Sequence, residues 1–146
     1  MSEWNSDNTA FDMSDDSTFE KAVSAYPVKT IDGTDFINVC SSVDVYQKKG
    51  KNIFFDEDVQ IALFRDGDSL FAVSNICPHQ YAAVICDGLL EEKTVTCPLH
   101  GWIYSLESGK ALGGNASLKT YRILELEGLI WLEKPKRSKP LWLENF

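Results

Sequence analysis

From residue 36 onward, the chain alternates short runs of β-branched, aromatic and aliphatic residues with turn residues. Runs of this length and spacing are typical of the strands of a small antiparallel sandwich or barrel. The clearest pair, 60–65 and 69–74, flanks Asp66-Gly67-Asp68, where glycine supplies positive φ at little steric cost. We therefore predict a hairpin that ends at Asn75. We expect the other strands at 36–40, 53–55, 94–96, 102–105, 119–126 and 129–132, with turns at 42–45, 87–88, 91–93, 106–109 and 127–128.

The two ends of the chain lack this pattern. Residues 1–35 carry eight acidic and two basic residues and show neither sustained alternation nor a helical stripe. A segment of low hydrophobicity and one-signed charge cannot bury enough surface to offset its ordering entropy. We expect a mobile acidic arm, although its few apolar residues leave open that part of it lies along the domain. Residues 134–146 form a basic and aromatic tail that either docks on a partner or packs back on the sheet through Trp142 and Phe146.

The bulk composition limits the possible classes of function. At 146 residues, of which 44% are hydrophobic, the chain is long enough for one folded domain and too short for two of ordinary size. The net charge of −8 disfavours nucleic acid, because phosphate binding needs clustered Lys and Arg. No apolar run approaches the roughly 20 residues that span a bilayer, and the N-terminus lacks a basic segment followed by an apolar one. We therefore expect a cytoplasmic monomer that binds neither nucleic acid nor membrane.

The candidate chemistry lies in the stretch from residue 75 to residue 104. Two short segments, Cys77-Pro-His79 and Cys97-Pro-Leu-His100, each offer one thiolate and one imidazole, and no other histidine occurs in the chain. Structural zinc also binds two Cys and two His, but zinc fingers usually pair Cys with Cys and His with His. Mixed pairs fit better a binuclear cluster in which one iron takes both thiolates and the other takes both imidazoles. The predicted hairpins would bring both segments to one end of the sheet, as a preorganised metal site requires.

These two segments, with Trp102 and the following Tyr104-Ser-Leu-Glu-Ser-Gly109, resemble the Rieske ferredoxins and the Rieske domains of ring-hydroxylating oxygenases. The resemblance extends over residues 36–133. It implies an all-β fold, namely a Rieske-type antiparallel β-sandwich with a cluster-binding subdomain formed by two hairpin loops. It also implies one 2Fe-2S cluster, with one iron held by two cysteines and the other by two histidines: Cys77 and Cys97, and His79 and His100.

The resemblance also bears on the redox potential. In the high-potential relatives, a serine hydroxyl of the second loop bonds a bridging sulfide and a tyrosine bonds a cysteine sulfur; the matching positions here are Trp102 and Tyr104. One donor is therefore absent, and hydrogen bonds to the sulfurs help to set the potential. We expect a low-potential centre near the bottom of the range of about −150 to +300 mV. Trp102 is equally well explained as a strand aromatic that covers the core.

The resulting hypothesis is an electron carrier rather than an enzyme, which passes single electrons from a flavin-dependent reductase to a terminal oxygenase. The first alternative is a Rieske-type small subunit of a nitrite-reductase-like complex. The second is a structural zinc module. An oxygenase α-subunit fragment is disfavoured, because its mononuclear iron would need further histidines. The remaining cysteines, Cys40 and Cys86, are expected to be free, buried thiols in a reducing cytosol.

Overall fold

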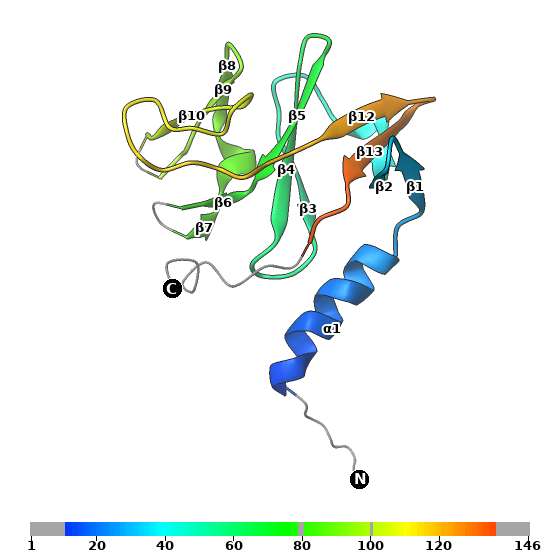
Figure 1. Ribbon diagram of the computed structural model, residues 1–146. Helices are drawn as coiled ribbons and strands as arrows, with labels where there is room; N and C mark the ends of the chain where they lie inside the picture. Colours follow the sequence, from blue (N-terminus) through cyan, green and yellow to red (C-terminus); the bar gives the residue numbers. More distant parts are fainter. Residues whose placement is uncertain (1–10, 79–80, 100, 137–146) are drawn as a thin grey trace.

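The computed structural model describes residues 11–78, 81–99 and 101–136. Within these residues the fold is an antiparallel β-sandwich with two smaller hairpin units at one end (Figure 1). One four-stranded sheet has the order β1-β2-β13-β12 and the other the order β11-β5-β4-β3, while β10, β9 and β8 form a three-stranded sheet and β6 pairs with β7. The strands are β1 Val28–Ile31, β2 Thr34–Ser41, β3 Lys51–Phe54, β4 Gln60–Asp66, β5 Ser69–Ser74, β6 Ile76–Cys77, β7 Ala82–Ala83, β8 Leu89–Glu91, β9 Thr94–Thr96, β10 Ile103–Ser105, β11 Thr120–Tyr121, β12 Ile123–Leu126 and β13 Leu129–Glu133.

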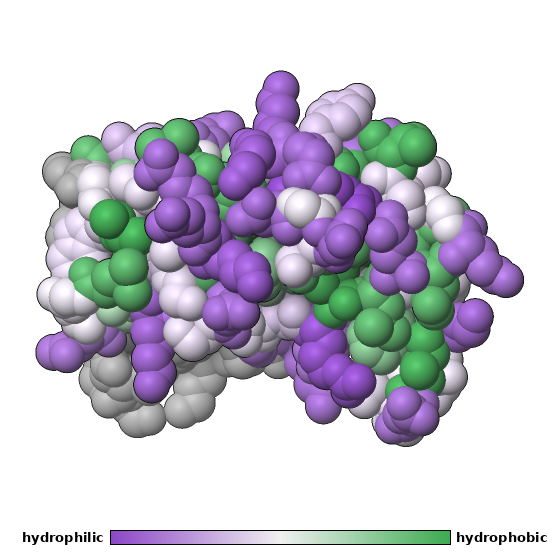
Figure 2. All heavy atoms as spheres, turned by 90° about the horizontal axis from the view of Figure 1, so that it is seen from above, coloured by the Kyte–Doolittle hydropathy of each residue, from purple (hydrophilic) through white to green (hydrophobic). Residues whose placement is uncertain are grey.

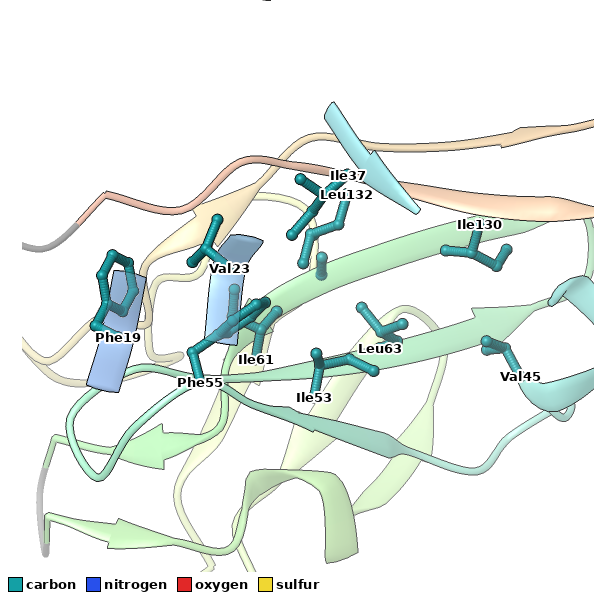
Figure 3. Packing of buried hydrophobic residues seen from close by; sticks show 11 residues of the cluster. Phe19, Val23, Ile37, Val45, Ile53, Phe55, Ile61, Leu63, Ile130 and Leu132 are labelled. Carbon is teal, nitrogen blue, oxygen red and sulfur yellow. The ribbon is translucent and has the colours of Figure 1, made fainter. Parts of the chain in front are cut away.

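Strand β4 is buried on both faces and joins the two parts of the molecule. Because side chains alternate across a strand, Ile61 and Leu63 enter the core between the two four-stranded sheets (Figure 3). Ala62 and Phe64, on the opposite face, enter a second core that the smaller hairpin units share. The smaller units therefore pack on the outer face of one sandwich sheet. They form a subdomain that has its own hydrophobic core and is supported by β4.

The N-terminal segment differs from the mobile arm that the sequence favoured. Residues Phe11–Ser24 form helix α1, and β1 pairs with β2 at the edge of a sheet. Phe19 and Val23, four residues apart on α1, are each 2% exposed and join the sandwich core (Figure 3). The Phe19 ring centroid lies 6.4 Å from that of Phe55. This arrangement agrees with the alternative that the sequence left open, that part of the segment lies along the domain, because two apolar residues one helical turn apart are enough to dock an otherwise polar helix.

Residues 1–10 lie outside the described residues. The same holds for residues 137–146 of the predicted tail, which include Trp142 and Phe146. Within the described part, no helix has the length and apolar character needed to cross a bilayer.

The single strand expected at 119–126 is in fact two strands. Residues Thr120–Tyr121 form β11, which pairs with β5, whereas Ile123–Leu126 form β12, which pairs with β13 in the other sheet. Arg122 lies between them and exchanges two backbone-anchored hydrogen bonds with Glu133: its amide donates to the carboxylate at 2.9 Å, and its carbonyl accepts from the Glu133 amide at 2.8 Å. The chain therefore changes sheets at Arg122, which a continuous β-type run of residues cannot reveal.

A partly buried arginine also connects the two sandwich sheets. Arg65, on β4, makes a bidentate ion pair with Glu125 on β12, with nitrogen–oxygen distances of 2.9 and 3.2 Å. Its guanidinium also donates to the carbonyl oxygens of Val45 and Ser42, at 2.9 and 3.2 Å. Both carbonyls lie in or beside η2, a short 3-10 helix at Ser42–Asp44 where a turn was predicted. Arg65 thus holds three segments of the sandwich in register.

Candidate metal centre

Two hairpin loops carry the expected ligands and share one backbone design. The first loop joins β6 to β7, and the second joins β9 to β10. In each, the amide four residues after the cysteine donates to the cysteine carbonyl: Tyr81 to Cys77 at 2.6 Å, and Gly101 to Cys97 at 3.0 Å. Both donors have positive φ, 54° for Tyr81 and 76° for Gly101. In each loop a backbone hydrogen bond therefore ties the cysteine to the residue four positions later, as expected of a preorganised metal site.

The two cysteines lie in the core of the subdomain. Cys77 is 0% exposed and Cys97 is 1% exposed, and neither forms a disulfide. They share a hydrophobic cluster with Tyr104, which is itself fully buried. Two buried, unbridged thiols in one cluster suit a soft metal or an iron–sulfur cluster, because thiolates prefer such metals.

The structure brings the Tyr104 hydroxyl to the first cysteine. Its oxygen lies 3.5 Å from Cys77 Sγ, within hydrogen-bonding distance for sulfur. Burial raises the pKa of Tyr104 well above its usual value, and the contact with Cys77 raises it further. The phenol therefore keeps its proton and can donate to a deprotonated sulfur. The family resemblance implied that Tyr104 bonds a cysteine sulfur and so helps to set the potential, and the structure places its hydroxyl within reach of Cys77 Sγ.

Trp102 lies beside the second loop and is half-buried. Its carbonyl oxygen accepts a hydrogen bond from the Cys97 amide at 2.7 Å, so the two residues bracket the loop. Its indole packs against Gly114, where an added Cβ would come within 2.7 Å of Cζ3. The segment around Gly114, which contains no proline, therefore packs a glycine backbone on the indole of Trp102.

Asn75 was not identified from the sequence as a site residue, yet it fixes the base of the first loop. It is fully buried, its amide donates to the Gln60 carbonyl at 2.7 Å, and its carbonyl accepts from the Ile85 amide at 3.1 Å. Its Oδ1 accepts from the Cys86 amide at 2.6 Å, while Nδ2 has no partner among the described residues. The available sequence signal was a polar residue placed between an apolar strand and the Cys-Pro dipeptide.

The other two expected ligands, His79 and His100, lie outside the described residues. In the part of the chain that is described, no group of three or more His, Cys, Asp or Glu residues is positioned to hold a metal ion. The residues that are described nevertheless fit a cluster with two thiolate ligands. Both sulfurs are buried, both belong to closed loops, and one has a hydroxyl within reach. The two remaining cysteines, Cys40 and Cys86, are free and half-buried, and burial raises the pKa of both thiols.

Comparison with known proteins identifies the family. The model of the Rieske-like [2Fe-2S] domain matches residues 35–133. The chain is 33% identical over 102 residues to the 3-phenylpropionate/cinnamic acid dioxygenase ferredoxin subunit of Escherichia coli (strain K12), which covers 68% of this chain and 94% of that protein. It is 30% identical over 101 residues to cholesterol 7-desaturase nvd of Hemicentrotus pulcherrimus, which covers 59% of this chain but 21% of that protein. The chain thus spans about a fifth of that relative's length.

A solved structure agrees in fold. A protein assigned as the small subunit of an NADH-dependent nitrite reductase from Mycobacterium tuberculosis superposes with a TM-score of 0.63 and 26% identity, over 70% of this chain and 96% of that one. Like the described part of this chain, the family is built on antiparallel β-sheets. The chain therefore belongs to the Rieske-like [2Fe-2S] domain family.

Proposed function

We propose that this protein carries single electrons between larger redox proteins, with Cys77 and Cys97 holding one iron of its cluster and His79 and His100 the other. Family membership gives the cofactor as a Rieske-type 2Fe-2S cluster, which replaces the structural zinc module considered from the sequence. When bound, the cluster supplies a one-electron couple. The observation that supports the proposal best is the pair of buried, unbridged cysteines on two matching loops.

The potential is proposed to be low for this family. Tyr104 places one hydroxyl near Cys77 Sγ, whereas Trp102, at the position of the other donor, has no hydroxyl and packs on Gly114. Fewer hydrogen bonds to the sulfurs leave the reduced state less stabilised. We therefore place the midpoint near the lower end of the range, about −150 mV.

For the partners, we propose a flavin-dependent reductase as the donor and a terminal oxygenase as the acceptor. The support is the dioxygenase ferredoxin subunit of E. coli, of which this chain covers 94%. The second candidate function is that of a nitrite-reductase small subunit, and the 26% identity and TM-score of 0.63 with the M. tuberculosis protein favour it. In either role the chain makes and breaks no substrate bonds, so we do not expect it to act as an enzyme by itself.

Elemental analysis and spectroscopy test the proposal directly. Freshly purified protein should be coloured, contain about two iron and two acid-labile sulfide per chain, and give an EPR signal when reduced by one electron. Cys77→Ser and Cys97→Ser should each lose the colour, whereas Cys86→Ser, a half-buried cysteine outside both loops, should keep it. Colourless protein that contains zinc would overturn the proposal. Co-purification with a flavoprotein reductase or with a sirohaem enzyme decides between the two partner systems.

A further inference from the structure

The small sheet of the subdomain presents an apolar row to solvent directly beside the second cluster loop. Residues that face each other across antiparallel strands lie on the same side of the sheet. Leu89 is opposite Thr96, and Thr96 is opposite Ile103. Leu112 continues the row, because its amide donates to the Ile103 carbonyl at 2.8 Å beside the bridge between residues 104 and 111. We call these four residues the outer row.

The outer row is exposed, and its register brings it to the loop. Leu89 is 59% exposed, Ile103 38% and Leu112 60%. Thr96 directly precedes Cys97, and Ile103 directly follows Trp102. The neighbouring positions on these strands point inward and are buried, as the period of two requires. The exposed leucines and isoleucine therefore belong to the outward-facing side of a regular sheet and are not core residues that have become exposed.

Charge is sparse at this end of the subdomain, where the exposed Asp87 borders the outer row, and it collects at the other end. No Asp, Glu, Lys or Arg occurs in residues 75–86, 94–106 or 111–118, although 25% of the chain is charged. The opposite end of the same sheet carries Lys93 and Glu107, whose side chains approach to 3.9 Å. Figure 2 shows hydrophilic side chains crowded over the middle of the molecule, with apolar side chains toward both ends. The acidic residues behind the net charge of −8 therefore lie outside these three segments.

We propose that the outer row is the docking surface for the redox partner, and that the partner presents an apolar surface without unpaired charge around its own redox centre. This inference depends on the proposed function. A partner charge placed against the row would be desolvated and find no counter-charge in the three segments, which is costly. An apolar partner surface would instead bury Leu89, Ile103 and Leu112 and gain from their removal from water. The competing arrangement is electrostatic docking of a basic partner on the acidic body.

A second copy of this chain has the required surface chemistry, and it serves as the probe. When oxidised and reduced molecules are mixed, one electron passes from the reduced copy to the oxidised copy and no bond is made or broken. The rate constant of this self-exchange is measured by NMR line broadening. Leu112→Glu places a carboxylate on the outer row. Val43→Glu is the matched control, since Val43 is also apolar and exposed (77%) but lies in η2 on the sandwich.

Both variants change the net charge from −8 to −9, so any difference between them reports the position of the new charge. We expect Leu112→Glu to slow self-exchange by at least about tenfold, because like charges then face each other across the contact. High salt should recover part of this loss. Val43→Glu should change the rate constant by less than about twofold. Leu89→Glu repeats the test on the same row if Leu112→Glu does not fold.

The outcomes distinguish failure of the docking inference from failure of the proposed function. Equal rate constants for the Leu112 and Val43 variants, with intact visible and EPR spectra, would overturn the docking inference and leave the electron carrier in place. Wild-type protein without an iron–sulfur spectrum would instead overturn the proposed function, and the docking inference with it.

Discussion

Replacing Tyr104 with Phe isolates one hydrogen bond at the proposed cluster. Tyr104 is fully buried and its hydroxyl oxygen lies 3.5 Å from Cys77 Sγ, so the variant removes one oxygen atom and keeps the ring packing. A hydroxyl that donates to a ligand sulfur stabilises the more negative, reduced state. If the difference between the redox states equals one neutral hydrogen bond, it is about 1 kcal/mol. For one electron, the midpoint potential then falls by about 40 mV, which voltammetry of the loaded protein measures.

The size of this shift should not depend on pH in the neutral range. Burial, followed by the contact with Cys77, raises the pKa of Tyr104 far above its usual value. A raised pKa means that the phenol stays protonated at every pH below it, so the hydrogen bond is present from about pH 6 to about pH 9. Potentials of wild type and variant, recorded over this interval, should run parallel.

Tyr121→Phe is the matched control for the same chemical change. Tyr121 packs against the sandwich core and not against the cysteines, and burial raises its pKa to about 12. Its hydroxyl is expected to change the potential by less than about 10 mV, because it bonds no ligand sulfur. An unchanged potential in Tyr104→Phe, with intact visible and EPR spectra, would refute the reasoning. So would an equal fall in both variants.

Three further variants test the fold. Phe19→Ala should lower the free energy of unfolding by about 3 kcal/mol in guanidinium titrations with the visible spectrum unchanged, whereas unaltered stability would contradict the docking of α1. Arg65→Ala should cost about 2 kcal/mol, mainly through the backbone carbonyls that lose a donor. Arg65 also holds the pKa of Glu125 below its usual range. The ion pair therefore stabilises the fold at a pH above the pKa of Glu125 in the unfolded chain, and this stabilisation is lost as the pH falls through the pKa of Glu125 in the folded chain. Because Glu125 is 38% exposed, the contribution of the ion pair to stability is small. Arg65→Ala should nevertheless make the free energy of unfolding fall less steeply as the pH is lowered. An unchanged dependence on pH in the acid range would count against the pair. Gly109→Ala should cost more than about 2 kcal/mol in the same titrations, since φ is +80° and a Cβ would overlap the Leu118 carbonyl oxygen; wild-type stability there would show that the turn can relax.

Local turn chemistry explains which parts of the fold were predictable. The hairpin at Gly67 has the expected positive φ of 64°, and strands β4 and β5 lie within one residue of the predicted ranges. The closing hairpin turns at Glu127 and Gly128, which both have positive φ. Helix α1 and the change of sheet at Arg122 depend on contacts between residues far apart in the chain, so no local pattern could reveal them.

The candidate site was predictable to the extent that its residues share a motif. The two Cys-Pro segments led to Cys77 and Cys97, and the resemblance to the Rieske proteins led to Tyr104; the structure brings these three residues into one buried cluster. Asn75 was missed because its importance comes from three partners on other segments. The contact of Trp102 with Gly114 could not be predicted either, because the sequence does not show which aromatic ring packs on a given glycine. The ligand roles of His79 and His100 stay a prediction.

The bonds of Asn75 have a mechanical consequence. This residue is the only one between β5 of the sandwich and β6 of the subdomain, and its backbone and side chain are bonded to Gln60, Ile85 and Cys86. A junction of one residue whose backbone amide, backbone carbonyl and Oδ1 are all hydrogen-bonded leaves little freedom for the two parts to swing about it. The molecule should tumble as a single rigid particle, so a protein that grips the sandwich would also fix the direction in which the subdomain points.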